Sequence, residues 1–496
     1  MNYKQFKSGT DIRGIAAEGV KDEHINLTDE AISAMTHGFL VWFCEKYDKQ
    51  ADEITVSVGH DSRISADRIK NAVISVLKVS GVKVLDCGLS STPSMFMTTV
   101  VKNCDAAIQI TASHHPFNRN GLKFFTRDGG VSGSDIGEML LNAENGKTAK
   151  KAEGSVEKID FMSEYSKILR DTIIRETGSE KPLEGLKIIV DAGNGAGGFY
   201  AYKVLEPLGA DIEGSQFLEP DGMFPNHIPN PENEVAMKAI SDATVKSGAD
   251  LGVIFDTDVD RASCVSSDGK EINRNRIVAL AAAIALENNQ GGTVVTDSVT
   301  SSGLKDFIEK DLGGKHHRFK RGYKNVIDEA VRLESTGVCA PLAIETSGHA
   351  AFKENYFLDD GAYLITKIII KMANLKKEGK TIDQLISALK EPKDLVELRF
   401  KIKVDDFRAY GEKVIADLFE KAQEKGLDIA PDNHEGIRIS INNGWFLLRL
   451  SVHDPIMPLN IESDDENGCK DIAKVIYDFL KDYSELDLTS IENYLK

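Results

Sequence analysis

The sequence predicts an α/β protein with three related α/β domains, each a mixed sheet sandwiched by helices, followed by a C-terminal α+β domain. Short apolar runs alternate with longer amphipathic segments through most of the 496 residues, which is typical of repeated α/β layers. A chain of this length exceeds what one hydrophobic core supports, so several domains are expected. After residue 395 the pattern changes, which indicates the α+β arrangement.

The domains are expected to span residues 1–156, 157–272, 273–394 and 395–496. Residues 143–155 are rich in Lys, Glu, Gly and Ala and are interpreted as a linker or surface loop. Glu391 and Pro392 mark a break before the last domain. No short repeat or low-complexity tract interrupts this organisation.

Each domain has elements that the hydrophobic pattern predicts. In the first domain, strands are expected at 54–58, 82–85 and 106–110, and a helix at 66–80. A polar helix at 157–178 leads into the second domain, with strands at 186–191 and 251–255. The clearest strands of the third domain are 293–296 and 342–344. The last domain is expected to contain strands at 396–402, 437–441 and 445–450 and a closing helix at 467–482.

Charge and composition exclude several classes of function. The formal net charge of −18 argues against non-specific binding of nucleic acid and against an anionic membrane surface. The six cysteines show no CxxC spacing, so reduced thiols are expected and a zinc site is not. The N-terminus lacks the apolar core of a signal peptide, and the longest apolar run, 277–286, is half of what a bilayer requires. A cytoplasmic location is therefore expected.

A serine follows the predicted strand 106–110 in the stretch Thr-Ala-Ser-His-His-Pro. Ser113 is therefore expected at the mouth of a strand, with His114 and His115 beside it and Lys123 ten residues further on. On its own this stretch fits a reactive serine, and it fits an ordinary polar loop equally well.

Three aspartates, Asp256, Asp258 and Asp260, follow the predicted strand 251–255. In an extended chain alternate residues face the same side, so the three carboxylates are expected to point one way. Two such charges about 4 Å apart repel by roughly 1 to 4 kcal/mol, which favours a bound cation. The hard oxygen ligands favour Mg²⁺ or Mn²⁺. An EF-hand is excluded because Arg261 and Ser267 occupy its glycine and glutamate positions, while a solvated acidic loop remains the alternative.

Gly193, Gly195 and Gly198 satisfy the G-x-G-x-x-G spacing after the predicted strand 186–191. This fingerprint keeps a nucleotide-dependent oxidoreductase open as a hypothesis from another class, to be tested by binding of NAD(H). Any tight strand-to-helix turn can collect glycines, so the pattern alone is weak.

Two more polar loops follow predicted strands. Glu345, Ser347 and His349 surround a glycine and suit recognition of sugar hydroxyls, or form an ordinary polar loop. Arg449, Ser451 and His453 alternate after a strand and suit binding of an anion, or form an exposed strand face.

In their order along the chain and in their sequences, these loops resemble those of the α-D-phosphohexomutase family, which includes phosphoglucomutase and phosphomannomutase. The resemblance covers nearly the whole chain. It extends to the stretches GTDIRG at 9–14, GHDSR at 59–63, PDGMFPNH at 220–227, PNPE at 229–232 and RGYKN at 321–325.

The resemblance implies a role for each candidate residue. Ser113 is expected to be the phosphoserine, and one Mg²⁺ per chain is expected on Asp256, Asp258, Asp260 and an oxygen of that phosphoserine. The other implied catalytic residues are Lys123 and His349 for proton transfer, Arg13 and Arg261 near the reacting phosphate, and His114 as a support for the serine. The implied substrate-binding residues are Lys324, Glu345 and Ser347 for the sugar, and Arg449, Ser451 and His453 for the other phosphate.

The implied activity is that of an isomerase that interconverts hexose 1-phosphate and 6-phosphate of glucose and/or mannose through a hexose 1,6-bisphosphate. The implied domains surround a central cleft, and the implied partner is a small phosphosugar, with a monomer or homodimer expected. Phosphoglucosamine mutase is the nearest alternative, and a catalytically inactive sugar-phosphate sensor is another.

Three departures from the family pattern are visible. His115 stands where the serine loop usually has asparagine, and Thr10 stands where some bacterial members have an aromatic residue. In the phosphate loop, Val452, His453 and Asp454 occupy the last places before Pro455. An aspartate at this position repels a phosphate.

Overall fold

The structure is a computed structural model that describes residues 2–451 and 454–496. The chain divides into two compact units, one of residues 1–277 with 347–384 and one of residues 278–346 with 385–496. The four predicted domain boundaries stay a prediction.

The first unit begins with an eight-stranded mixed sheet in the order β1-β2-β6-β5-β3-β4-β8, with β7 paired to β6. Its parallel strands β5, β3, β4 and β8 adjoin the antiparallel strands β6 and β2. The strands are β1 (Lys7–Ser8), β2 (Asp11–Ile15), β3 (Thr55–His60), β4 (Lys83–Leu89), β5 (Ala106–Ile110), β6 (Arg119–Thr126), β7 (Gly129–Gly130) and β8 (Ser155–Lys158).

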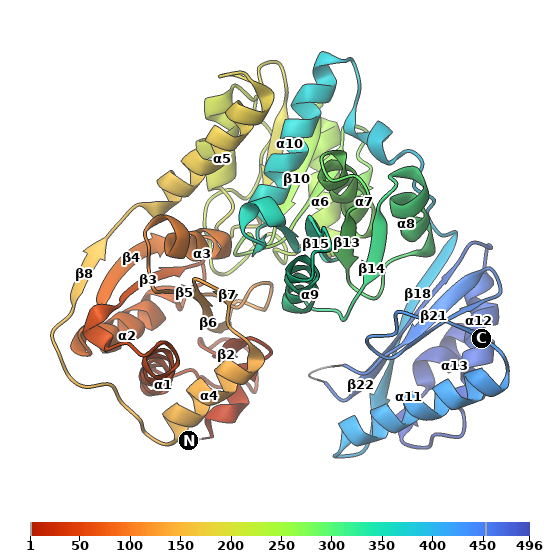
Figure 1. Cartoon of the computed structure of the whole chain (residues 1–496), viewed down its shortest axis with the longest axis horizontal. Coiled ribbons are helices and arrows are strands. Elements are labelled where there is room, and N and C mark those ends of the chain that lie inside the picture. Colours follow the sequence, from red (N-terminus) through yellow and green to blue (C-terminus); the bar gives the residue numbers. More distant parts are fainter. Residues whose placement is uncertain (1, 452–453) are drawn as a thin grey trace. The chain divides into compact units, whose positions relative to one another are not determined.

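Helices cover both faces of this sheet. Figure 1 shows α1 (Asp29–Tyr47), α2 (Ala66–Val79) and α4 (Gly133–Glu144) on one face and α3 (Thr92–Val101) on the other. Thr28 caps α1 by accepting a hydrogen bond from the amide of Ala31 at 3.2 Å. The apolar faces of α1, α2 and α4 form one core with the sheet, so the strand ends that carry the polar loops are fixed.

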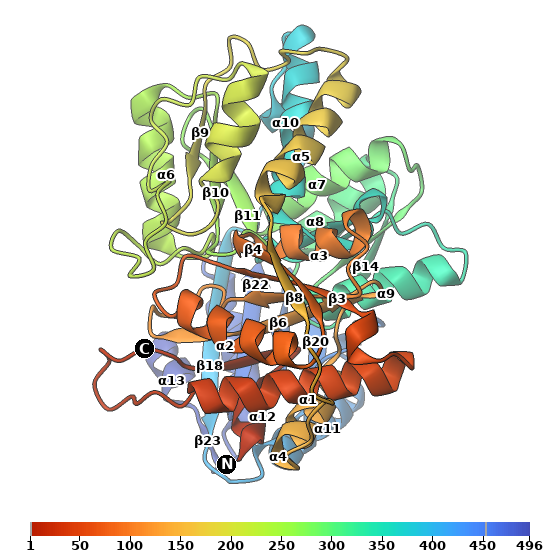
Figure 2. The same ribbon diagram turned by 90° about the vertical axis from the view of Figure 1, so that its left-hand side faces the viewer.

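A second sheet of the first unit has the order β12-β11-β10-β9. Its strands are β9 (Ile188–Asp191), β10 (Leu251–Phe255), β11 (Ala262–Ser266) and β12 (Glu271–Ile272). Figure 2 shows β9 and β10 between α6 (Glu234–Ser247) and α10 (Gly361–Lys377), and α10 packs on α5 (Phe161–Thr177). The short strands β16 (Ala350–Phe352) and β17 (Leu358–Asp359) pair in front of α10 in sequence.

The second unit contains two sheets. Strands β13 (Thr293–Thr296), β14 (Lys315–Arg318) and β15 (Leu342–Ile344) are parallel, with β13 central. The neighbouring helices are α7 (Asn275–Glu287), which begins in the first unit, α8 (Ser302–Asp306) and α9 (Tyr323–Ser335).

The C-terminal sheet has six strands in the order β19-β20-β21-β22-β18-β23. Its core joins one sheet face to α11 (Phe407–Glu424), α12 (Gly468–Leu480) and α13 (Thr489–Leu495), which confirms the predicted α+β class. The strands are β18 (Asp394–Ile402), β19 (Asp428–Ile429), β20 (Ile437–Ile441), β21 (Gly444–Leu448), β22 (Ile456–Ser463) and β23 (Leu486–Asp487).

The predicted fold class is confirmed, and most predicted elements lie within a few residues of the observed ones. The glycine-rich turn after β9 leads into a helical segment that is π-helical at Tyr200–Leu205 and a 3-10 helix at Glu206–Leu208. The final helix α13 has no counterpart among the predicted elements. Among the described residues no helix combines the length and the apolar character that crossing a bilayer requires.

Candidate active site

Ser113 lies three residues after β5, as predicted, and its side chain is surrounded by charge. Its hydroxyl donates to Asp256 Oδ2 at 3.1 Å and accepts from Arg261 Nη2 at 2.8 Å. The backbone of Ser113 is left-handed, with φ of 49°, a conformation that costs free energy for a non-glycine residue. Such strain clusters at functional sites, and the surrounding contacts must maintain it.

Arg63 provides the contacts that maintain the serine loop. Its guanidinium donates to the carbonyl oxygens of Ser113 (through Nη2), His115 (2.6 Å), Pro116 (2.7 Å) and Arg119 (2.9 Å). The buried carboxylate of Asp61 neutralises it at 3.2 Å. A planar fork with five donors is suited to binding several carbonyls of one loop, so Arg63 fixes the backbone on which Ser113 is presented.

The three aspartates come together, but not in the way the sequence predicted. Residues 256–261 form a tight turn in which Val259 has a φ of 68°, so the chain is not extended there. The prediction of three carboxylates on one side of an extended chain was wrong in its geometry. The turn is held by backbone contacts: Ala196 N donates to Thr257 O at 2.8 Å, and Gly361 N donates to Val259 O at 3.1 Å.

The aspartate cluster fits a divalent cation. Asp256, Asp258 and Asp260 offer carboxylate oxygens that all lie within 4.8 Å of one another. Within the described residues, Asp258 Oδ1 and Asp260 Oδ1 are buried and have no hydrogen-bond partner. Buried carboxylate oxygens without a proton donor are costly, and hard oxygen ligands of this kind suit Mg²⁺. These residues therefore form a chemically suitable site for the ion.

The electrostatics of the cluster are asymmetric. Burial, with the charge of Asp260, raises the pKa of Asp256 well above its usual value. Burial acts in the same direction on Asp260, but Lys123, His349 and Arg261 together hold the pKa of that carboxyl below its usual value. Lys123 Nζ on β6 donates to Asp260 Oδ2 at 2.6 Å and lies 3.8 Å from Asp258 Oδ2. Lys123 thus lies beside two of the three aspartates, and its catalytic role stays a prediction.

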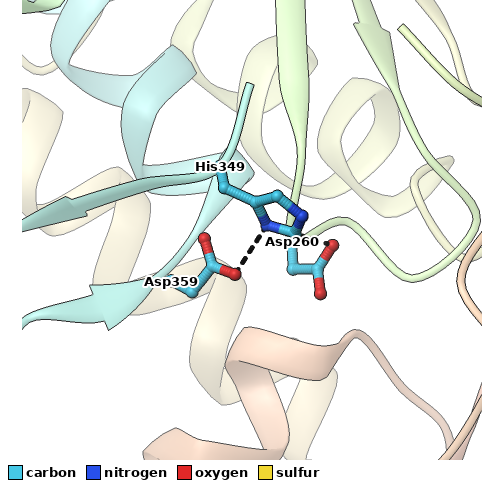
Figure 3. A group of neighbouring side chains, drawn as sticks. All are labelled: Asp260, His349 and Asp359. Carbon is cyan, nitrogen blue, oxygen red and sulfur yellow. Dashed lines mark hydrogen bonds and ion pairs between the residues drawn. The ribbon is translucent and has the colours of Figure 1, made fainter. Parts of the chain in front are cut away.

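His349 lies between two carboxylates, one of which sequence reasoning did not identify. Figure 3 shows its ring pointing between Asp359 and Asp260, with Nδ1 2.7 Å from Asp359 Oδ2 and 3.8 Å from Asp260 Oδ1. Although burial opposes it, the charges of Asp359 and Asp260 raise the pKa of His349 to about 9. The contact with Asp359 fixes the orientation of the ring and leaves Nε2 as its other proton-carrying atom.

His114 lies beside the serine, with its Nδ1 3.3 Å from Ser113 Oγ, and its role as a support stays a prediction. Burial and the nearby charge of Arg261 lower the pKa of His114 to about 2. Its Nδ1 therefore accepts a hydrogen bond from Arg261 Nη2 at 2.7 Å. Arg13, on β2, lies close enough to contribute to the low pKa of His114 and pairs with Asp11 at 2.9 Å. Ser347, two residues before His349, is buried in the same unit.

The glycine-rich loop has a packing role in this structure. A Cβ on Gly195 would lie 2.6 Å from Thr257 O, and one on Gly193 would lie 2.6 Å from Pro229 Cβ. A Cβ on the third glycine, Gly198, would lie 2.2 Å from Leu218 O. The glycines thus allow the backbone of the aspartate turn and its neighbours to approach closely, which explains the spacing without a dinucleotide.

The remaining predicted residues lie in the second unit. Lys324 Nζ, on α9, pairs with Asp328 at 2.7 Å along its own helix. Glu345 Oε1, after β15, accepts from Gly322 N at 2.6 Å, and Arg449 Nε lies 3.5 Å from Glu435 Oε1. The amide of Ser451 donates to Ile456 O at 3.0 Å. His453 lies outside the described residues.

Sequence reasoning missed the roles of Arg63, Asp359 and Thr92. Thr92, at the start of α3, donates its hydroxyl to Asp258 Oδ2, and its amide donates to Asp258 O at 2.8 Å. The stretch 59–63 entered only as part of the family resemblance, without a role for Arg63. The pair Asp359-Asp360 before Gly361 was an available signal, because two adjacent acids in an apolar context require partners.

Comparisons with known proteins agree with this geometry. The chain matches the three domain models of phosphoglucomutase/phosphomannomutase, α/β/α domain I at residues 4–149, domain II at 163–269 and domain III at 273–392. It is 30% identical to a phosphomannomutase/phosphoglucomutase of Pseudomonas syringae pv. tomato over 88% of this chain and 89% of that protein. It is 32% identical to a phosphoglucomutase/phosphomannomutase of Thermococcus kodakarensis over 89% of this chain and 90% of that protein.

A solved structure is similar over the whole length. A phosphoglucomutase/phosphomannomutase family protein from Burkholderia thailandensis superposes with a TM-score of 0.80 at 25% identity, covering 98% of this chain and 100% of that one. The sequence identities, the order of the matched domains and the fold thus agree with one another. The chain belongs to the phosphoglucomutase/phosphomannomutase family.

Proposed function

We propose that the protein is a phosphohexomutase that interconverts the 1-phosphate and 6-phosphate of glucose and/or mannose, with Ser113 as the phosphate carrier. The observation that carries the proposal is the position of Ser113 Oγ, which bonds both an aspartate of the candidate metal site and Arg261. A hydroxyl between a metal-ligating carboxylate and a guanidinium is suited to phosphoryl transfer, in which charge neutralisation and positioning are the main requirements.

The proposed reaction is two phosphoryl transfers. In the first, the bond from phosphorus to Ser113 Oγ breaks and a bond from phosphorus to the free sugar hydroxyl forms, giving a hexose 1,6-bisphosphate. The proton lost by the sugar hydroxyl is balanced by the proton gained at Ser113 Oγ. The intermediate then reorients end over end in the site, and the reverse transfer returns its other phosphate to the serine. Water must be excluded meanwhile, because it would otherwise accept the phosphoryl group.

Two residues are candidates for moving the proton, namely His349 and Lys123. His349 is oriented by Asp359 at 2.7 Å, and Lys123 Nζ is bound to Asp260 at 2.6 Å. Because Lys123 Nζ is bound to Asp260, one of the proposed metal ligands, we assign Lys123 to charge neutralisation. We assign proton transfer to His349 through Nε2, the ring nitrogen that is not bound to Asp359.

The proposed cofactor is Mg²⁺. Asp256, Asp258 and Asp260 would hold it, together with an oxygen of phosphorylated Ser113. A bound divalent cation would neutralise charge on the transferred phosphoryl group. Removal of one ligand by Asp258→Asn is expected to abolish turnover and to weaken Mg²⁺ binding measured by calorimetry. Full Mg²⁺ affinity in that variant would contradict the assignment.

The sugar and its second phosphate are assigned to the polar loops that the family resemblance implies. We propose that Lys324, Glu345 and Ser347 contact the sugar and that Arg449, Ser451 and His453 contact the phosphate that does not react. Discrimination between sugars at C2 depends on one or two hydrogen bonds. The assay below therefore also tests whether glucosamine 1-phosphate is a substrate. A cytoplasmic location and a monomer or homodimer belong to the same proposal.

The test combines peptide mass spectrometry with activity assays. Purified protein is digested to determine whether Ser113 carries phosphate, and turnover is measured with the 1-phosphates of glucose, mannose and glucosamine. We expect phosphate on Ser113, turnover of glucose or mannose 1-phosphate, and loss of turnover in Ser113→Ala. An active enzyme whose Ser113→Ala variant keeps full turnover contradicts the mechanism, and binding without turnover of any sugar phosphate indicates an inactive sensor.

A further inference from the structure

A carboxylate of the last domain, Glu435, joins three segments of the second unit. It lies in the turn between β19 and β20, half-buried. Its Oε1 accepts from Ser298 Oγ at 2.7 Å, and its Oε2 accepts from the backbone amide of Arg321 at 2.9 Å. The same Oε1 lies 3.5 Å from Nε of Arg449. One side chain thus contacts the ends of two strands of one sheet and an arginine of the other.

The backbone next to Glu435 fixes this arrangement. Gly436 has a φ of +63°, and a Cβ there would lie 2.1 Å from Leu448 O and 2.7 Å from the Cα of Arg449. The ladder that follows pairs Ile437 with Leu448. The chain at Glu435 therefore lies directly against the chain at Arg449, and a larger residue than glycine at 436 would separate them. The ion pair is a consequence of main-chain packing and not of two flexible side chains meeting at the surface.

Arg449 depends on a neighbouring anion because it is largely buried. Burial and the nearby guanidinium of Arg321 both lower the pKa of Arg449, and Glu435 opposes them. A guanidinium presents separate edges to its partners. Glu435 lies on the Nε side of this guanidinium, and the edge formed by Nη1 and Nη2 is of the kind that binds a phosphate in a bidentate manner.

We infer that Glu435 is a positioning residue, which orients Arg449 for the phosphate that does not react and couples it to the sugar-binding loop. The coupling runs through two adjacent residues, because Arg321 N donates to Glu435 while Gly322 N donates to Glu345 Oε1 at 2.6 Å. The groups assigned to sugar and to phosphate are thereby held at a fixed spacing. This inference rests on the proposed function and adds to it a residue that sets the distance between the two recognition groups.

The test is the variant Glu435→Gln. The amide retains an acceptor for Arg321 N and can donate to Ser298 Oγ, so the main change is the loss of negative charge beside Arg449. We expect KM for hexose 1-phosphate and 6-phosphate to rise about tenfold, with kcat within about threefold of the wild type, as for loss of one charge-assisted contact. Inhibition by inorganic phosphate is expected to weaken in parallel.

Two further variants separate positioning from a general loss of structure. Asp417→Asn is the matched control, because this carboxylate of α11 accepts from Tyr483 at 2.9 Å in the same domain. It is expected to leave KM and phosphate inhibition unchanged. Introducing Glu435→Gln into an Arg449→Gln background is expected to cause no further rise in KM, because Glu435 acts through Arg449. Additive losses in the double variant, or a lowered unfolding temperature with unchanged KM, would overturn the inference.

Direct binding keeps this test distinct from that of the proposed function. Binding of glucose 6-phosphate to the intact protein is measured by calorimetry with wild type and Glu435→Gln. If the wild type binds the ligand but shows no mutase turnover, the proposed function fails, while weaker binding to Glu435→Gln still supports the role of Glu435. Equal affinity in the two proteins, or no binding to the wild type, overturns it.

Discussion

Replacement of Arg63 is the perturbation whose effect can be derived most fully from the structure. Its side chain and that of Asp61 are both fully buried, and its guanidinium donates to four carbonyl oxygens of the serine loop. Arg63→Met keeps much of the volume and removes every donor. Each hydrogen bond from a charged donor contributes about 1.5–3 kcal/mol, so four of them set an upper limit near 6–12 kcal/mol.

The measurable loss is expected to be smaller than that limit. Once the loop opens, its carbonyl groups regain hydrogen bonds from water. In addition, Asp61, whose pKa burial already raises to about 6 despite Arg63, becomes protonated when its partner is removed. We therefore expect the free energy of local loop opening to fall by about 4 kcal/mol, which corresponds to roughly a thousandfold faster hydrogen exchange at residues 111–121.

The assay pairs exchange with turnover. Misplacement of a reacting group by about 1 Å costs about a hundredfold in rate, so kcat is expected to fall by at least that factor in Arg63→Met. The control is Arg68→Met, because Arg68 Nη2 also donates to backbone carbonyls, Ala16 O at 2.9 Å and Leu27 O at 3.0 Å, but not to the serine loop. Equal losses of kcat per folded molecule in both variants, or unchanged exchange at 111–121 in Arg63→Met, would refute the reasoning.

Three other predictions follow from the same contacts. Asp359→Asn removes the charge that contributes most to stabilising the His349 imidazolium, so in metal-free protein the pKa of His349, now raised to about 9, should fall, as measured by NMR titration. Burial raises the pKa of Asp360 from 3.8 to about 6, so its stabilising contribution is greatest below about pH 4 and is lost as the pH rises through 6. Asp360→Asn should remove this dependence, about 3 kcal/mol in size, from unfolding measurements; an unchanged profile would contradict the cause. Gly195→Ala places a Cβ 2.6 Å from Thr257 O and should weaken Mg²⁺ binding at least about tenfold, whereas Gly137→Ala on α4 should not; equal affinities would refute the packing role.

The strands and the serine loop were accessible from the sequence because each depends on a local pattern. The predicted strands 106–110, 251–255, 293–296, 342–344 and 437–441 coincide with β5, β10, β13, β15 and β20. In the first four cases a short, largely apolar run ends before an acidic or polar residue, and in the fifth, 437–441, apolar and polar residues alternate. Burial of the apolar side chains determines the element in both kinds of pattern. The family resemblance then supplied roles that the local pattern cannot supply.

What remained out of reach depends on contacts between distant segments. The partners of Arg63 are carbonyl groups about fifty residues away, and a carbonyl leaves no trace in a side-chain pattern. The left-handed backbone at Val259 replaced the expected extended chain, because the turn is shaped by contacts with residues 92, 196 and 361. The spacing of the glycines is visible in the sequence. The sequence does not reveal that the aspartate turn packs against Gly195. No local pattern in the sequence distinguishes Glu435 from other glutamates, and only the structure shows that it lies beside Arg449.

The central claim is that Ser113 carries the transferred phosphoryl group. The most direct test is a single-turnover experiment with enzyme labelled with radioactive phosphate on Ser113 and mixed with unlabelled glucose 6-phosphate. The account predicts that the label leaves the protein at a rate compatible with kcat. The label should appear first in hexose bisphosphate and then in hexose monophosphate. Label that stays on Ser113 while the substrate turns over, or that is released only as inorganic phosphate, would contradict it.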